Sequence, residues 1–181
     1  MKTESNVMYI LRLALTLLAI TAVVAAALAG VNSVTAPAIA ELTAQKTQAA
    51  IEQVLPGGGE IVDFPETALV SKVYASETGY AVEVTPGGFD NTITMMVGVD
   101  KTGSVLGISI ISHTETAGLG AVAAAGTPAG ESFRNEFVGA TSSVSVTKDG
   151  GEVEAITGAT ITSRAVCVGV NAALEVVGKM G

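Results

Sequence analysis

The feature of this 181-residue chain that most restricts its fold is an uncharged apolar segment near the N-terminus. Residues 13–31 contain no Asp, Glu, Lys or Arg, and Leu, Ala, Val and Ile make up most of the segment. A helix rises about 1.5 Å per residue, so roughly 20 apolar residues span the ~30 Å hydrocarbon layer of a bilayer. We therefore expect a membrane-spanning helix, with the Arg12 side chain extending to the membrane surface.

A cleaved signal peptide is the alternative for this segment, because Ala27-Leu28-Ala29 is similar to a small-residue cleavage site. The apolar run is longer than the core of a typical signal peptide, which favours a retained anchor. Lys2 and Arg12 precede the run, and the first positive charge after it is Lys46. The positive-inside bias then predicts a single-pass protein of the cell (inner) membrane, with a cytoplasmic N-terminus and an extracytoplasmic domain.

Charge and composition exclude several classes of function. The formal net charge is −8, aromatic residues make up 4% of the chain, and Trp is absent, so we expect no nucleic-acid partner. Cys167 is the only cysteine, which rules out an intramolecular disulfide or a multi-cysteine metal centre; we interpret it as a small core residue. His113 is the only histidine. We expect no metal site and no catalytic residue.

Periodicity and turn residues predict the elements of the part that follows the membrane segment. Pro37 is expected to interrupt the helical pattern, which then resumes and stops at the Pro and Gly residues that follow residue 55. Two short helices are expected at 121–125 and 132–137, and a terminal helix at 164–179 has apolar residues at helical spacing. The strands expected from β-type segments and their turns are 68–74, 80–84, 93–99, 105–111, 144–146 and 153–156.

This order of elements predicts an α+β domain with a mainly antiparallel sheet and flanking helices, not a βαβ nucleotide-binding fold. The Gly118-Leu119-Gly120 sequence lacks the third glycine of a dinucleotide fingerprint, so no NAD or ATP site is assigned. The domain organisation expected is a cytoplasmic N-terminus and transmembrane helix at 1–34, a juxtamembrane helix and linker at 35–57, and an extracytoplasmic domain at 58–181.

A hydroxyl-rich segment (residues 157–163) lies just before the terminal helical pattern, with the sequence Thr-Gly-Ala-Thr-Ile-Thr-Ser. A helix N-terminus favours anions, because its first N–H groups lack helical partners. Gly158 and Ala159 leave the backbone accessible to a bulky phosphorylated ligand, and a hydroxyl here can receive a phosphate covalently. Local physics alone favours the simpler interpretation, a glycine turn and a Thr/Ser cap that binds no ligand. Either way, we expect Thr162 at the surface or at the cap.

The hydroxyl-rich segment resembles the Ser/Thr-Gly-Ala-Thr-x-Thr motif of the FMN-binding domain. That domain occurs in the G subunit of Rnf-type complexes and in the C subunit of sodium-pumping NADH:quinone reductases. The resemblance implies that Thr162 binds FMN through a phosphoester bond. It also implies that four neighbours shape the phosphate region: Gly158, Ala159, Thr160 and Ser163.

A second motif lies upstream, in the His113 loop (residues 112–120). It resembles the family's His-x-Glu-Thr-Pro-Gly-Leu-Gly sequence, with Ala117 in place of proline. Glu154 likewise replaces the more common aspartate before the first motif. The resemblance implies that the loop approaches the flavin or a neighbouring subunit, although a purely structural loop fits each residue taken singly. The residues implied are His113, Glu115, Thr116, Gly118 and Leu119.

The function implied is that of an electron-carrying subunit with covalent FMN, and the enzyme implied is the translocase complex to which such a subunit belongs. Such a complex couples electron exchange between ferredoxin and NAD to Na⁺ or H⁺ movement. The partners implied are the other subunits, membrane lipid and a flavin transferase for maturation. Two alternatives remain: an electron carrier like the C subunit of the quinone reductase, and a membrane-anchored redox sensor. The short chain favours the Rnf type.

Overall fold

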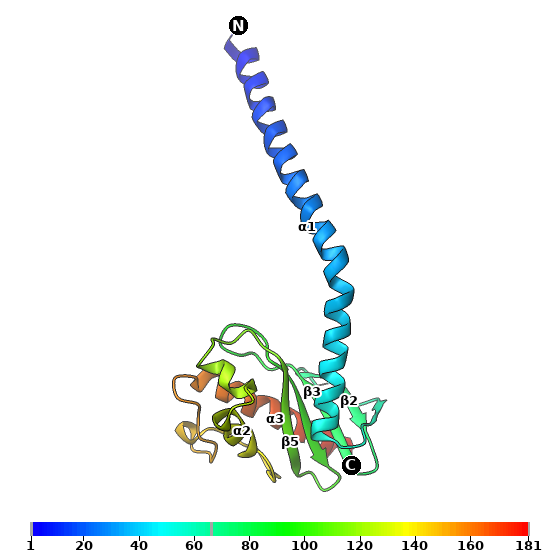
Figure 1. Ribbon diagram of the computed structural model, residues 1–181. Helices are drawn as coiled ribbons and strands as arrows, with labels where there is room; N and C mark the ends of the chain where they lie inside the picture. Colours follow the sequence, from blue (N-terminus) through cyan, green and yellow to red (C-terminus); the bar gives the residue numbers. More distant parts are fainter. Residues whose placement is uncertain (1, 66, 181) are drawn as a thin grey trace. The chain divides into compact units, whose positions relative to one another are not determined.

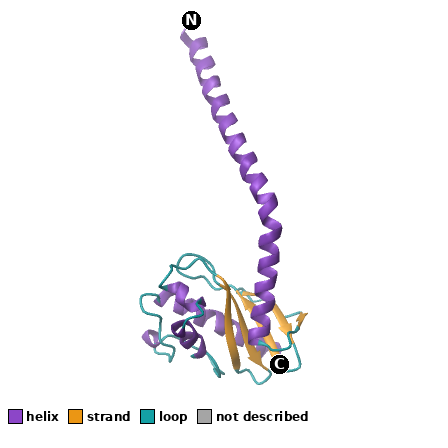
Figure 2. Cartoon of the chain, in the orientation of Figure 1, coloured by secondary structure: helices purple, strands orange, loops and turns teal. Residues whose placement is uncertain are grey.

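The computed structural model describes residues 2–65 and 67–180, with side chains from residue 6 onward. The chain divides into two compact units, Met1–Ala44 and Gln45–Gly181, which are described separately. Figures 1 and 2 show the helices and strands of both units. The helices are α1 (Lys2–Val54), α2 (Pro128–Asn135) and α3 (Thr160–Met180), with 3₁₀ turns η1 (Gly120–Ala124) and η2 (Thr147–Asp149).

The first unit consists of the N-terminal part of α1, whose apolar side chains are exposed along its length. Leu17 and Leu28, for example, are 64% and 65% exposed, as expected for a helix that faces lipid hydrocarbon. The helix is long and apolar enough to cross a membrane, which agrees with the expected span. α3 is also long and apolar enough, but it is mostly buried within the second unit and is a core helix.

The expected break at Pro37 is wrong, because α1 continues through this residue. The pyrrolidine ring fixes φ near −65°, which is a helical value, so the cost is one backbone hydrogen bond and crowding of the ring against the carbonyl one turn earlier. A single such loss is tolerated within a long helix of good helix-forming residues.

The second unit is built on a five-stranded antiparallel sheet in which each strand pairs with the next along the chain. Four of these strands lie where alternation and turn residues predict them. The three-residue β1 was missed, because its mostly exposed residues show no apolar alternation. The strands are β1 (Glu60–Val62), β2 (Val70–Ala75), β3 (Gly79–Val84), β4 (Thr94–Asp100) and β5 (Val105–Ser112).

The β4–β5 hairpin is closed by the side chain of Asp100. Its Oδ1 accepts hydrogen bonds from the backbone N–H groups of Thr102 (2.8 Å) and Ser104 (2.9 Å) and from the Thr102 hydroxyl (2.7 Å). These donors lower the pKa of the Asp100 carboxyl. The turn pairs β4 with β5 in antiparallel register.

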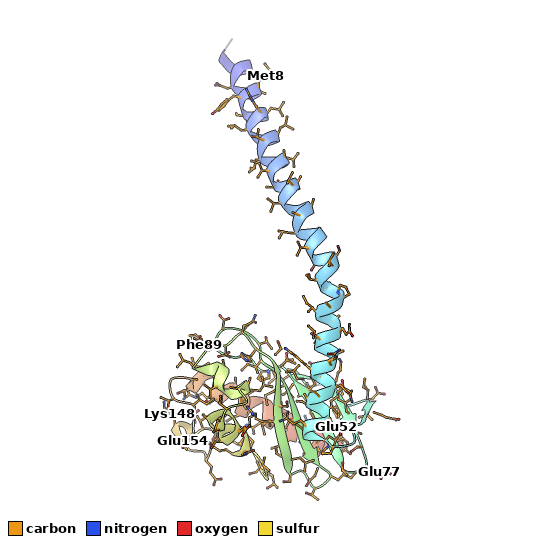
Figure 3. All side chains as sticks on the ribbon, viewed as in Figure 1. Met8, Glu52, Glu77, Phe89, Lys148 and Glu154 are labelled. Atoms are coloured by element: carbon orange, nitrogen blue, oxygen red, sulfur yellow. The ribbon has the colours of Figure 1, made fainter. Side chains whose placement is uncertain are left out.

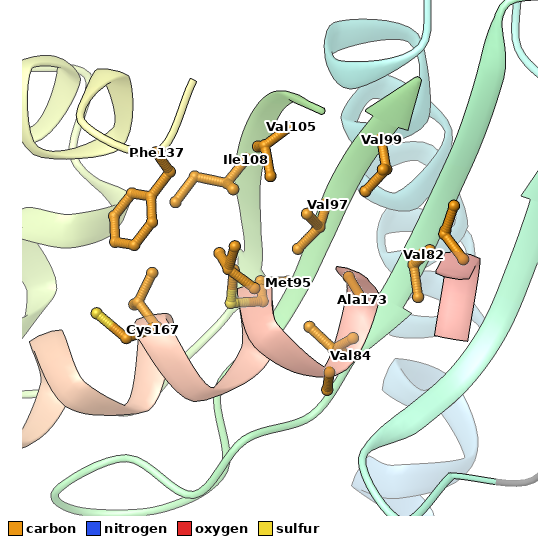
Figure 4. Packing of buried hydrophobic residues seen from close by; sticks show 14 of the residues in the cluster. Val82, Val84, Met95, Val97, Val99, Val105, Ile108, Phe137, Cys167 and Ala173 are labelled. Atoms are coloured by element: carbon orange, nitrogen blue, oxygen red, sulfur yellow. The ribbon is translucent and has the colours of Figure 1, made fainter. Parts of the chain in front are cut away.

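Side chains from both faces of the sheet are buried, and the two faces have different partners. Residues such as Val82 and Val97 belong to the large core that includes α3 (Figure 4). On the other face, Met96 packs with the last turns of α1 in a smaller cluster. Gly98 permits this packing, because a Cβ there would overlap the carbonyl oxygen of Val54. Cys167 lies in the large core, where burial raises its pKa to about 11, so its expected core position is confirmed.

The segments between β5 and α3 differ from expectation in their boundaries. α2 begins at Pro128, because the Thr127 side chain accepts a hydrogen bond from the Gly130 N–H and caps the helix. The strands expected at 144–146 and 153–156 reduce to one bridge between Val146 and Val153, since η2 occupies the chain between them. The expected helix at 164–179 begins four residues earlier, at Thr160.

Candidate functional site

The hydroxyl-rich segment forms the turn before α3 and the first turn of the helix itself. Gly158 has a φ of +77°, in the left-handed region that favours glycine. The Ser163 hydroxyl donates to the Ala159 carbonyl (3.0 Å) and accepts from the Ile156 N–H (3.0 Å). Ser163 is fully buried, so both of its bonds serve to fasten the turn onto the helix.

Thr162 is buried, with only 1% of its surface exposed, and the expectation of a surface or capping threonine is wrong. Its hydroxyl donates a hydrogen bond of 2.6 Å to Oε2 of Glu115. The burial follows from the early start of α3, which turns residue 162 toward the His113 loop. The two motifs thus meet at one contact between a hydroxyl and a carboxylate, whose residues are 47 positions apart in the sequence.

Glu115 is a buried carboxylate that receives donors on both of its oxygens. Its Oε1 accepts from the backbone N–H of Phe89 at 2.8 Å and, more weakly, from that of Asp90 at 3.4 Å. Two glycines make room for it: a Cβ at Gly88 would overlap Oε1, and a Cβ at Gly120 would lie 2.5 Å from Oε2. These bonds offset the cost of burying a charged group.

A cavity of about 290 Å³ opens beside this contact and draws its walls from both motifs. Three apolar side chains at its edge are substantially exposed: Phe89 at 65%, Leu119 at 43% and Ile161 at 49%. Apolar side chains together with a few polar groups such as Glu115 and Lys148 are typical of a small-molecule site. The residues that line the cavity are Phe89, Glu115, Thr116, Leu119, Gly120, Lys148, Gly158, Ala159, Thr160 and Ile161.

Lys148 contributes a positive charge to this cavity, and Figure 3 labels it together with Phe89. Its Nζ donates to the Thr160 hydroxyl at 3.0 Å. The η2 turn is joined to α3 by Arg164, whose guanidinium donates two 2.6 Å bonds to the Asp149 carboxylate and lowers the pKa of that group. A lysine beside a helix N-terminus is a favourable environment for phosphate.

Sequence reasoning missed both Lys148 and Phe89 as site residues. Phe89 follows the Pro86-Gly87-Gly88 turn, and its backbone N–H contacts Glu115. Lys148 precedes the hydroxyl-rich segment by nine residues, and only the fold of η2 brings it to Thr160. A positive charge near an expected phosphate site was the available signal for Lys148.

His113 lies at a different cavity from the rest of its loop. That cavity has a volume of about 410 Å³ and is formed by β5, the last turns of α1 and Ala124. The His113 Nδ1 is buried and has no hydrogen-bond partner among the described residues. Of the other residues named in the loop, Glu115, Thr116 and Leu119 line the 290 Å³ cavity beside the Thr162–Glu115 contact, whereas Gly118 forms an open turn with a φ of +76°. The structure therefore brings most of the expected residues to the 290 Å³ cavity, but not His113 or Gly118.

Comparison with known proteins identifies the family of this chain. The FMN-binding domain family matches residues 88–175, a range that contains both motifs. The G subunit of the Na⁺-translocating ferredoxin:NAD⁺ oxidoreductase complex of Acetobacterium woodii is 33% identical over 97% of this chain and 95% of its own length. The G subunit of the ion-translocating oxidoreductase complex of Methanosarcina acetivorans is 32% identical over 93% of this chain and 94% of its own length.

A third relative is the G subunit of the proton-translocating ferredoxin:NAD⁺ oxidoreductase complex of Clostridium ljungdahlii. It is 39% identical over 56% of this chain and 57% of its own length. Identities above 30% along nearly the whole chain, together with the FMN-binding match, identify the family. The chain belongs to the G-subunit family of Rnf-type ion-translocating oxidoreductase complexes and contains the FMN-binding domain of that family.

Proposed function

We propose that the chain is the electron-carrying flavoprotein subunit of a membrane-bound Rnf-type complex, with FMN attached through a phosphoester to Thr162. The complex couples electron transfer between ferredoxin and NAD to the movement of Na⁺ or H⁺. The observation that carries this proposal is the junction of the two motifs at the Thr162–Glu115 contact, beside a cavity that contains Lys148. Relatives named for both Na⁺ and H⁺ translocation leave the coupling ion open.

The residues around the cavity fit an FMN. Lys148 and the N-terminal N–H groups of α3 complement the negative charge of the phosphate. Phe89, Leu119 and Ile161 present apolar surface to the isoalloxazine ring. The bound flavin supplies the redox chemistry, and the chain sets its position, the polarity around it and its access to partners. The bare backbone at Gly120 and Gly158 keeps bulk away from the phosphate region.

Covalent attachment is useful on the extracytoplasmic side of a membrane, where lost FMN is not readily replaced. Attachment requires a flavin transferase as a maturation partner. Intact mass measurement after co-expression with the transferase tests the proposal, because a phosphoester-linked FMN survives denaturation. We expect full modification of the unaltered chain and none of Thr162→Ala, with partial modification of Thr162→Ser. A denatured chain without the flavin mass, from cells that contain an active transferase, contradicts the proposal.

The proposed topology puts residues 1–34 in the cytoplasm and the cell (inner) membrane and residues 35–57 at the extracytoplasmic surface of that membrane. The FMN-binding domain of residues 58–181 then lies outside the cytoplasm. The charge bias of Lys2 and Arg12 supports this orientation. Protease added from the extracytoplasmic side should degrade the domain in sealed membranes. Degradation from the cytoplasmic side alone would reverse the topology.

Purification in mild detergent should recover the other subunits of the complex, and recovery of the chain alone favours the sensor alternative.

A further inference from the structure

The Thr162–Glu115 contact has the geometry of a nucleophile beside a base. The Thr162 Oγ1 lies 2.6 Å from Glu115 Oε2, and both side chains are buried. A neutral hydroxyl is a weak nucleophile until a neighbouring group accepts its proton. The second carboxylate oxygen is held by the Phe89 N–H at 2.8 Å, so the orientation of the acceptor is fixed. Nucleophile, base and orienting donor are therefore already aligned.

We propose that Glu115 accepts the Thr162 proton when the phosphoester forms, which makes it a catalytic residue of the chain's own flavin attachment. This inference rests on the proposed function. In the step, Oγ1 of Thr162 attacks the flavin-side phosphorus of a flavin nucleotide activated as a phosphoanhydride. The Oγ1–P bond forms, the anhydride P–O bond breaks, the second phosphoryl group leaves with the bond electrons, and the proton moves to Oε2 of Glu115.

The same contact accounts for the choice of Thr162 among the four hydroxyls of its segment. The Thr160 oxygen accepts from the Lys148 ammonium, which is a donor and cannot take a proton. Ser163 is engaged with the backbone of the turn, and Thr157 is exposed. In the described part of the chain, Thr162 is the hydroxyl of this segment that donates to a carboxylate.

Because Thr162 is buried, the flavin phosphorus has to approach its Oγ1 from a particular side. Glu115, Gly120 and Leu119 line the 290 Å³ cavity, so we place the approach of the flavin phosphorus on this side of Glu115. A protonated Glu115 can then donate to the new phosphodiester, which avoids two adjacent negative charges.

The test measures the rate of covalent flavin attachment to the purified full-length chain, with saturating transferase and activated flavin nucleotide. Glu115→Gln preserves the shape of the side chain and removes its proton-accepting charge, and we expect a rate about 100-fold slower, as for loss of a general base. The KM of the transferase for the chain should change little. Glu115→Asp, which keeps a carboxylate, should recover part of the rate. Glu152→Gln is the matched control at an exposed carboxylate and should label like the unaltered chain.

All rates are measured below the unfolding midpoint of the least stable variant, so that each chain is folded. Attachment to Glu115→Gln at the unaltered rate, or equal rates for the Gln and Asp variants, overturns the role of Glu115. Thr162→Ala is included as a separate arm. A labelled Thr162→Ala overturns the proposed attachment site instead, so the two failures are distinguishable.

Discussion

The two ends of the His113 loop lie at different cavities, although His113 and Glu115 are only two residues apart. Glu115 contacts Thr162 and Phe89 in the cavity at the start of α3, whereas His113 lies with β5 and the end of α1. A continuous motif in the sequence therefore serves two places in the fold. Substitutions that disturb the Glu115–Thr162 contact should affect flavin attachment, and those at the His113 end should not.

The largest effect is expected from crowding the Glu115 end. Gly120→Ala places a Cβ 2.5 Å from both the Glu115 carboxylate and the Thr162 hydroxyl, which separates the pair. Overpacking of this kind costs about 1–3 kcal/mol, and we expect little covalent flavin to form. Gly118→Ala is the matched control, because its φ of +76° also makes the substitution unfavourable, by about 1–3 kcal/mol.

A Cβ at Gly118, however, meets nothing within 4 Å in the described structure. Thermal unfolding midpoints should therefore fall for both glycine variants, while in-gel flavin fluorescence should fall only for Gly120→Ala. Equal labelling of the two variants would show that the space beside Glu115 is not required.

A smaller effect is expected from Lys148, which contributes charge to the cavity from an exposed position. Lys148→Ala should reduce the apparent affinity for the flavin donor by about 2- to 5-fold, because exposed ion pairs contribute about 0.2–1 kcal/mol. The measurement is the attachment rate as a function of donor concentration. Lys101→Ala, in the exposed β4–β5 turn, removes the same charge elsewhere and should have no effect.

No change in attachment is expected at the other end of the loop. His113→Ala alters the cavity beside α1 and leaves the Thr162 contact in place, so the labelling rate and the flavin absorbance spectrum should match those of the unaltered chain. The labelling rate is measured from samples quenched at successive times, and the flavin absorbance spectrum is recorded for the folded and the denatured protein. Loss of covalent flavin in His113→Ala would show that both cavities contribute to flavin attachment.

A last prediction concerns stability and not attachment, at the surface ion pair between η2 and α3. The Arg164 hydrogen bonds lower the pKa of Asp149 in the folded state, so the pair stabilises the fold above the ordinary aspartate range and loses this contribution as pH falls through the lowered value. The difference in unfolding midpoint between the unaltered chain and Asp149→Asn should thus vanish in acid. A difference that grows as pH falls contradicts this sign.

Sequence patterns identified much of this fold because its elements are local. The apolar run, the alternating strands around Met96 and the Asp100 turn each carry their own signal. The site was predicted less completely, because its parts are joined by long-range contacts. The burial of Thr162 and the approach of Lys148 depend on where α3 begins and how η2 folds, and helix boundaries are the least reliable feature of a sequence pattern.

The central claim is that Thr162, and not a neighbouring hydroxyl, bears the flavin. Trypsin cleaves after Lys148 and Arg164 and so releases one peptide, residues 149–164, that contains the whole hydroxyl-rich segment. Fragmentation mass spectrometry of this peptide, from chain co-expressed with the transferase, locates the modification directly. The account predicts a phosphoflavin on Thr162, with Thr157, Thr160 and Ser163 unmodified. A flavin on any of those three residues, or a peptide with no flavin, contradicts it.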